Sequence, residues 1–145
     1  MIFSTSALEL ELSNNIIMNN LIVDAARDNI FLALIVNENI YTCRHENSKI
    51  NFEKLMVLIN EFLKNNKKSL DNIDAIYVNR GPGSFAGIRN SLSTIKALFL
   101  TKKIDYYCFS YEDFREPEAI KYEDVPQLCK KYKIKKNLIN PIYLS

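Results

Sequence analysis

The chain has 145 residues, of which 48% are hydrophobic and 25% are charged, and its formal net charge is +2. A single domain of this length buries roughly two-thirds of its unfolded surface, so it can form a hydrophobic core. The composition is that of an ordinary globular protein, and the small net charge does not by itself favour nucleic-acid binding. Three widely spaced cysteines without a Cys-x-x-Cys pair argue against a disulfide framework and a zinc knuckle.

Cysteine usage of this kind favours a reducing cytoplasm. No stretch approaches about 18 uninterrupted apolar residues, so we expect no membrane-spanning segment. The N-terminus has no basic flank before an apolar stretch, which argues against a secretory signal. The expected localisation is therefore cytoplasmic.

Residues 1–19 are unlike the rest of the chain. Residues 8–12 alternate leucine and glutamate, as a β-strand does, and Ser13-Asn14-Asn15 would end that strand. A second methionine, Met18, stands directly before the first convincing strand. We interpret residues 1–19 as an N-terminal extension or as a start assigned too early, with Met18 the true start; an added edge strand is the alternative.

Apolar runs predict strands at residues 21–24, 30–36 and 40–43, which together form a meander. The second run is long enough for a strand that is buried on both faces. Two later runs, at residues 73–78 and 104–109, predict two further strands.

Two segments show the apolar spacing of amphipathic helices. The first covers residues 52–63, with Asn51 as the expected N-cap, and the second covers about residues 86–100. The flank of the second helix carries small side chains, which allow another helix or the sheet itself to approach closely. These side chains are Ser91, Ser93, Thr94 and Ala97.

A shorter helix is expected at residues 124–132, capped by Asp124. A strand, a helix and a strand in succession around the second helix imply a right-handed crossover and parallel pairing. The sequence therefore predicts an α/β fold with a mixed sheet of about five strands and two main helices.

All three glycines of the chain lie in the segment 79–89, which reads Asn-Arg-Gly-Pro-Gly-Ser-Phe-Ala-Gly-Ile-Arg. This segment, which we call the glycine turn, stands between a predicted strand and the second helix. Glycine tolerates positive φ and permits close approach of another backbone or a ligand. We therefore predict that the chain turns sharply here.

The glycine turn does not match a Walker phosphate loop, because Gly83 and Gly87 are too close and no Lys-Ser or Lys-Thr pair follows. Gly81-x-Gly83-x-x-Ala86 fits a relaxed dinucleotide fingerprint. However, its strand does not open the fold, and too little chain follows residue 110 for a second nucleotide-binding half. Arg80 and Arg89 flank the turn and could face an anion or serve a structural role.

The residues indicate no catalytic constellation and no metal site. Ser84 does not lie in a Gly-x-Ser-x-Gly motif. As a nucleophile it would need a nearby base, and the single histidine, His45, is expected in a loop. One histidine is also too few for the usual catalytic metal centre.

Near the C-terminus, five lysines occur within seven residues. This run forms either a solvated face or a contact with the phosphate backbone of tRNA. Its members are Lys130, Lys131, Lys133, Lys135 and Lys136.

Residues 79–99 resemble the signature of the TsaB family, formerly YeaZ, whose pattern is Gly-Arg-Gly-Pro-Gly-Ser-Phe-Thr-Gly-Leu-Arg. Asp24-Ala25-Ala26 is similar to the family's Asp-Thr-Ala, and residues 141–144 are similar to its terminal Pro-Val-Tyr-Leu. Lys96 falls on a lysine that the family has later in the helix. The residues that match the pattern directly are Arg80, Gly81, Pro82, Gly83, Ser84, Phe85, Gly87 and Arg89.

Members of this family have two lobes of the RNase H-like, actin-like kind, and this chain stops near the end of the first lobe. The resemblance implies a division into residues 1–19, an RNase H-like N-terminal lobe at residues 20–112, and a short C-terminal segment at residues 113–145 in place of the second lobe. The chain departs from the pattern at Ala86, where the family has threonine, and at Asn90-Ser91, where it has Ile-Gly.

The resemblance implies a non-catalytic subunit that binds TsaD and supports threonylcarbamoyl transfer to adenosine in tRNA. TsaE joins the assembly, and tRNA is reached through the complex. The resemblance also implies that ATP or ADP and the metal belong to the partner proteins, with no cofactor in the isolated chain. The family's contacts come from the two helices of the first lobe, which makes Met56, Ile59, Leu63, Phe85, Ile88, Ser91, Leu92 and Ile95 the expected partner interface.

Other interpretations remain open. Apolar helix faces also favour a homodimer when TsaD is absent. A small nucleotide-binding or phosphate-binding protein could use the turn between Gly81 and Gly87, and the lysine run could contact tRNA directly. Peptidase activity is disfavoured because the catalytic partners are missing.

Overall fold

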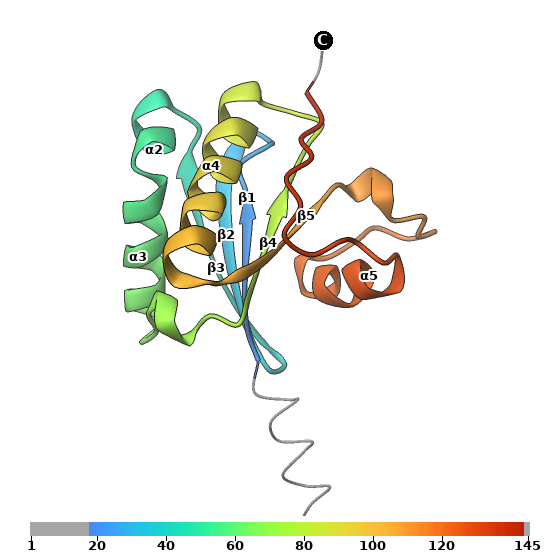
Figure 1. Cartoon of the computed structure of the whole chain (residues 1–145), viewed down its shortest axis with the longest axis horizontal. Helices are drawn as coiled ribbons and strands as arrows, with labels where there is room; N and C mark the ends of the chain where they lie inside the picture. The colour runs from blue at the N-terminus through green and yellow to red at the C-terminus, as the bar shows by residue number, and fades with distance from the viewer. Residues whose placement is uncertain (1–17, 144–145) are drawn as a thin grey trace, which may run out of the picture.

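The computed structural model describes residues 18–143. They form a mixed α/β fold around a five-stranded sheet, which confirms the predicted fold class (Figure 1). The strand order is β3-β2-β1-β4-β5. The strands are β1 (Asn19–Asp24), β2 (Asn29–Val36), β3 (Asn39–Glu46), β4 (Ala75–Asn79) and β5 (Asp105–Phe109). The interpretations of residues 1–17 lie outside the described residues.

The predicted meander is confirmed, because β2 pairs antiparallel with both β1 and β3. β4 pairs parallel with both β1 and β5, as the expected crossover requires. Strand β3 extends to Glu46, so His45 lies in a strand opposite Ile30 and not in a loop. The prediction for His45 is wrong because antiparallel pairing with β2 continues past the apolar run that indicated the strand.

The first predicted helix is divided into α2 (Lys49–Glu53) and α3 (Leu55–Asn65). Lys54 separates them with φ −104° and ψ 24°, outside the helical conformation. The predicted cap is also wrong. The Ser48 hydroxyl caps α2 by accepting a hydrogen bond from the Asn51 backbone N–H at 3.1 Å, while the Asn51 side chain donates to the carbonyl of Glu46.

The second predicted helix is α4 (Phe85–Lys102), and the short one is α5 (Val125–Lys131). Ser84 caps α4, since its hydroxyl accepts from the Gly87 N–H at 3.1 Å. Asp124 precedes α5 but does not cap it with its side chain. Its carboxylate instead accepts from the Lys121 N–H at 3.2 Å, which closes the turn before the helix.

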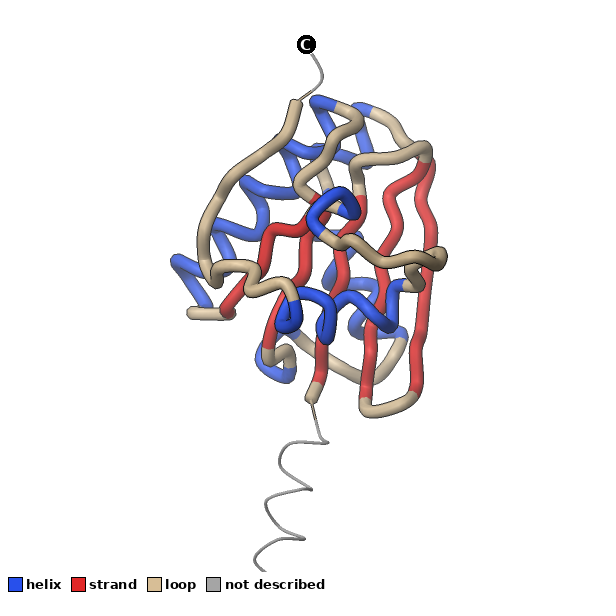
Figure 2. The backbone as a smooth tube through the Cα atoms, turned by 90° about the vertical axis from the view of Figure 1, so that its right-hand side faces the viewer, coloured by secondary structure: helices blue, strands red, loops and turns tan. Residues whose placement is uncertain are grey.

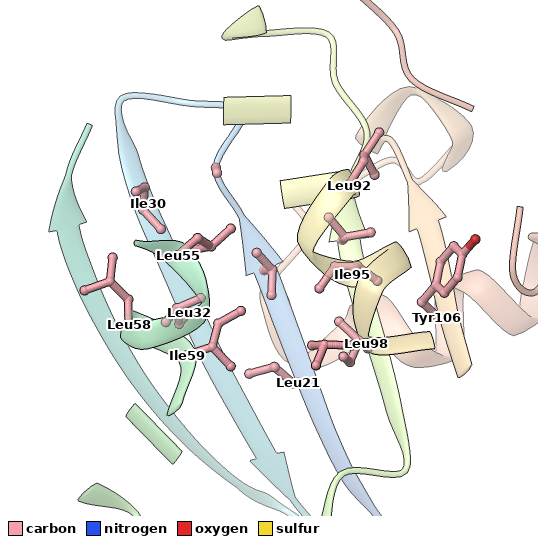
Figure 3. Close-up of a cluster of buried hydrophobic side chains, with 14 of the residues drawn as sticks. Leu21, Ile30, Leu32, Leu55, Leu58, Ile59, Leu92, Ile95, Leu98 and Tyr106 are labelled. Atoms are coloured by element: carbon pink, nitrogen blue, oxygen red, sulfur yellow. The ribbon is translucent and has the colours of Figure 1, made fainter. Parts of the chain in front are cut away.

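The sheet is covered on both faces. Helices α2, α3 and α4 lie on one face, and α5 lies on the other (Figure 1). Figure 2 shows α5 and the loops around it across this second face. Each face has its own hydrophobic cluster. The first includes Leu21, Leu32, Ile59 and Ile95 (Figure 3), and the second includes Tyr77, Phe109, Phe114, Val125 and Leu128.

The predicted partner interface is wrong for six of its eight residues. These six side chains face the sheet and belong to the first cluster or are buried beside it, because the same apolar spacing that suggested a contact surface is needed to form the core. Met56 is half-buried, and Phe85 is exposed. The buried residues are Ile59, Leu63, Ile88, Ser91, Leu92 and Ile95.

Two leucines in α4 test this assignment of faces. Leu98 is 2% exposed and Leu100 is 58% exposed. We expect Leu98→Ala to lower the free energy of unfolding by about 2–5 kcal/mol, because it removes apolar contacts and leaves a cavity. Leu100→Ala is the matched control and should change it by less than about 0.5 kcal/mol. Equal losses in urea denaturation would contradict the described packing of α4.

Candidate functional site

The glycine turn connects β4 to α4 and packs directly on other backbone segments. A Cβ at Gly83 would overlap the carbonyl oxygen of Ala26, and a Cβ at Gly87 would overlap that of Ala25. The Ser84 N–H donates a hydrogen bond to the Ala26 carbonyl at 2.9 Å. The start of α4 is thus seated on the loop that follows β1, and only glycine permits that distance.

The C-terminal residues lie against the other side of the turn. Gly81 has φ +109°, and a Cβ there would overlap the carbonyl oxygen of Ile142. The Ile142 N–H donates to the Arg80 carbonyl at 2.7 Å, and the rings of Phe85 and Tyr143 lie 4.7 Å apart between centroids. The sharp turn predicted from the glycines is confirmed, but this second packing partner was not predicted from the sequence.

The two arginines that flank the turn have different environments. Arg80 forms a two-point contact with Asp113, with Nη2–Oδ1 at 2.6 Å and Nε–Oδ2 at 3.3 Å, and it also donates to the carbonyl of Asn140 at 3.1 Å. These bonds assign Arg80 a structural role. Arg89 is exposed, and its guanidinium carbon lies 5.7 Å from the centre of the Phe85 ring.

Ligands of open α/β sheets bind at the carboxyl ends of parallel strands, where the strand order changes direction. In this sheet that place lies between β1 and β4, which end at Asp24 and Asn79. Asp24 is 1% exposed. Its carboxylate accepts hydrogen bonds from Asn79 Nδ2 at 3.1 Å, the Ala26 N–H at 3.3 Å and the Tyr122 hydroxyl at 2.7 Å.

Tyr122 closes this place from the C-terminal segment. Its ring stacks on Phe31 with centroids 4.3 Å apart. Burial raises the pKa of Tyr122, and the adjacent Asp24 carboxylate raises it further, so the hydroxyl remains a donor. The Arg27 guanidinium lies 3.9 Å from the same carboxylate. The strand ends are therefore occupied by the chain's own side chains.

The sequence did not single out Asp24, Asn79, Asp113 or Tyr122 as site residues. Asp24 closes an apolar run and Asn79 opens the glycine turn, so their positions in the sequence weakly indicate a place at the strand ends. Nothing in the sequence indicates Tyr122, because its contact with Asp24 joins residues 98 positions apart.

The other chemical candidates have structural roles or lie apart. Ser84 serves as the helix cap, and His45 Nε2 lies 3.7 Å from Cys43 Sγ on β3. Between residues 18 and 143 there is no group of three or more His, Cys, Asp or Glu side chains that could hold a metal ion. Within the same range, no helix has the length and apolar character needed to cross a membrane.

The helical face carries exposed apolar side chains. A groove of about 400 Å³ lies between α2 and α4, lined by Lys49, Phe52, Glu53, Ala86, Arg89 and Asn90. The exposed large apolar residues of α2, α3 and α4 are Ile50, Val57, Phe85 and Leu100. We call these four residues, together with the half-buried Met56, the helical surface patch.

The lysine run is divided by its contacts. Lys131 Nζ lies 2.9 Å from Glu116 Oε2, and Lys136 Nζ lies 3.7 Å from Asp105 Oδ2. Hydrogen bonds from Tyr132 and Lys131 lower the pKa of Glu116. Within the described part of the chain, the other three members have no acidic partner. These are Lys130, Lys133 and Lys135.

The sheet order and the helices on its first face define a single lobe of the RNase H-like, actin-like kind. Two solved structures share this fold. They are "YeaZ from Pseudomonas aeruginosa" and "Crystal structure of an uncharacterized protein with similarity to peptidase YEAZ from Pseudomonas aeruginosa". Each has a TM-score of 0.59 and 20% identity over 64% of this chain, and the match covers 44% and 43% of the respective structures.

Sequence comparison finds similar proteins over part of the chain. A family model described as "TsaD: tRNA N6-adenosine threonylcarbamoyltransferase" matches residues 45–110. The tRNA threonylcarbamoyladenosine biosynthesis protein TsaB of Buchnera aphidicola subsp. Baizongia pistaciae (strain Bp) is 37% identical over 65 residues, or 39% of this chain and 29% of that protein. The TsaB protein of Buchnera aphidicola subsp. Schizaphis graminum (strain Sg) is 29% identical over 90 residues, which are 62% of this chain and 43% of that protein.

The resemblance to the TsaB (YeaZ) family predicted from the glycine turn is thus confirmed. The chain spans less than half the length of the relatives that it matches. The proposed division at residues 20–112 and 113–145 stays a prediction.

The glycine turn provides a test of its own packing. We expect Gly83→Val to lower the free energy of unfolding by about 3 kcal/mol or more, because the new side chain overlaps a backbone carbonyl that cannot move away freely. Ala97→Val, on the exposed side of α4, is the control and should cost less than about 1 kcal/mol. A Gly83→Val variant as stable as the control would contradict the close approach.

Tyr122 should make the chain sensitive to alkali. Its folded-state pKa is raised above the ordinary value of 10.0, so the stabilisation is complete below that pH and is lost as the pH rises above it. At pH 8, Tyr122→Phe should cost about 1–3 kcal/mol, because the buried Asp24 carboxylate loses a donor. In urea denaturation at pH 11, the difference between the two proteins should shrink. Tyr41→Phe, on the exposed edge of β3, should show neither effect.

Proposed function

We propose that the chain is a non-catalytic scaffold and activator subunit that binds a TsaD-type transferase and supports threonylcarbamoyl transfer to adenosine in tRNA. The names of the curated relatives support a role in tRNA threonylcarbamoyladenosine biosynthesis. The family model that matches residues 45–110, described by the name of the transferase itself, supports a common pathway.

The observation that carries the scaffold role is the contrast between the two candidate sites. At the ends of β1 and β4, where a nucleotide would bind, the carboxylate of Asp24 is buried and hydrogen-bonded to three groups of the chain. On the helical face, by contrast, large apolar side chains stand in solvent. Large apolar side chains exposed on one face of a protein are typical of a protein-binding surface.

The helical surface patch replaces the interface expected from the sequence. Val57 and Phe85 are 50% and 56% exposed, which makes them the apolar contacts that a partner could cover. Ser93 and Ala97 are exposed on α4 between Phe85 and Leu100. Their small side chains would let a partner helix approach α4 closely, as in helix pairs with small residues at the crossing.

The remaining expectations follow from this role. ATP or ADP and a metal would be held by the partners, TsaE would join the assembly, and tRNA would reach the chain through the complex. A second copy of the chain could cover the same patch when TsaD is absent, which makes a homodimer the alternative occupant. The interpretation as a nucleotide-binding protein has less support, because Arg80 is paired with Asp113 and Ser84 caps α4.

Co-expression with the TsaD of the same organism tests the proposal. We expect the two chains to co-elute in size-exclusion chromatography, and we expect the added chain to raise threonylcarbamoyl transfer to tRNA. Val57→Asp with Phe85→Asp should abolish co-elution, because two charges would be buried in an apolar contact.

A matched control carries the same added charge elsewhere. Tyr41→Asp with Ile40→Asp alters exposed apolar residues on β3, away from α2–α4, and should co-elute as the unmodified chain does. The scaffold proposal is wrong if the unmodified chain neither co-elutes with TsaD nor raises transfer activity.

A further inference from the structure

A second cavity lies between the sheet and α5, on the face opposite the helical surface patch. Its volume is about 380 Å³, within the range of small-molecule sites. It is lined by Tyr77, Tyr107, Pro126, Cys129, Lys130, Lys133 and Ile134. We call it the tyrosine–lysine pocket.

The pocket has two tyrosines from adjacent strands. Tyr77 and Tyr107 are directly paired across β4 and β5, and their rings stack with centroids 5.0 Å apart and an interplanar angle of 10°. Tyr77 is only 7% exposed. Among residues 18–143, neither hydroxyl has a hydrogen-bond partner within the chain. Both hydroxyls are open to the pocket, so a bound molecule could accept a hydrogen bond from each.

The hydroxyl of Tyr77 remains a donor at physiological pH. Burial raises the pKa of Tyr77, and the neighbouring Tyr107 raises it further. Burial also raises the pKa of the Cys129 thiol to about 12, so this thiol carries no charge. No lining residue is a carboxylic acid. Negative charge is thus absent from the walls of the pocket.

Two lysines at the end of α5 supply positive charge. The helix ends in a Schellman motif, in which the Ile134 N–H donates to the Cys129 carbonyl at 2.9 Å and the Lys133 N–H donates to the Lys130 carbonyl at 3.2 Å. Lys133 occupies the left-handed position of this motif, with φ 54°. The motif sets the backbone of both residues beside the pocket, and their exposed side chains line it. Lys131, between them in sequence, instead pairs with Glu116.

We propose that the tyrosine–lysine pocket binds a small phosphorylated molecule with a planar apolar part. The phosphate oxygens would accept hydrogen bonds from Lys130, Lys133 and the tyrosine hydroxyls, all of which are donors. Pro126 and Ile134 offer apolar surface to the rest of the ligand. This inference does not depend on the scaffold role, since it uses the other face of the sheet.

Calorimetry with the whole chain tests the pocket, using AMP as the probe and adenosine and inorganic phosphate as its two halves. AMP should bind more tightly than either half, because only AMP engages both the charged and the apolar walls. Lys130→Ala with Lys133→Ala should weaken AMP binding about tenfold or more. Tyr107→Phe should weaken it less, through the loss of one hydroxyl.

The matched control removes the same charge outside the pocket. Lys64→Ala with Lys135→Ala should leave AMP binding unchanged, and thermal melting would establish that each variant is folded. The proposal is overturned if AMP does not bind at millimolar concentration, or if both lysine pairs weaken it equally.

The phosphate that the lysines contact could belong to an RNA backbone instead of a free small molecule. An oligoadenylate without a terminal phosphate distinguishes these two sources. If it binds more tightly than AMP, and the two lysine pairs contribute equally, the lysines contact an RNA backbone and the pocket proposal is wrong. Weaker binding of the oligoadenylate than of AMP supports a site for a free small molecule.

Discussion

The rest of the structure depends on the close approach between the loop after β1 and the start of α4. The carbonyl oxygens of Ala25 and Ala26 occupy the space in which side chains of residues 87 and 83 would lie. This approach sets the position of α4 over the sheet, so Ile95 and Leu98 reach the core while Leu100 and Phe85 stay exposed. One backbone constraint therefore determines both the packing of the first cluster and the composition of the helical surface patch.

The C-terminal segment gives the lobe its second layer. Tyr122 reaches the ends of β1 and β4, Asp113 holds Arg80, and Ile142 pairs with the backbone of the glycine turn. These contacts use the polar groups that a phosphate ligand would otherwise contact. The glycine turn, which looked suited to an anion, consequently joins the C-terminal segment to the sheet. The sites left for a partner or a ligand are on the two outer faces of the lobe.

The two surfaces differ in character. The helical surface patch is apolar and open, which suits a macromolecular partner. The tyrosine–lysine pocket is concave and carries donors and positive charge, which suits a small anion. The elements that carry them, α2–α4 and α5, lie on opposite faces of the sheet (Figure 1). Occupation of one would not block the other, so a scaffold role and ligand binding are compatible.

By itself the sequence determined the strands, the position of the glycine turn and the family resemblance, because these depend on local periodicity and on residues close together in the chain. Only the tertiary structure decided which side of each helix is buried, so Ile59 and Ile88 became core residues. It also decided the partners of Asp24 and Arg80, since those contacts join residues far apart in sequence. Apolar spacing identifies a face of a helix but not what covers it.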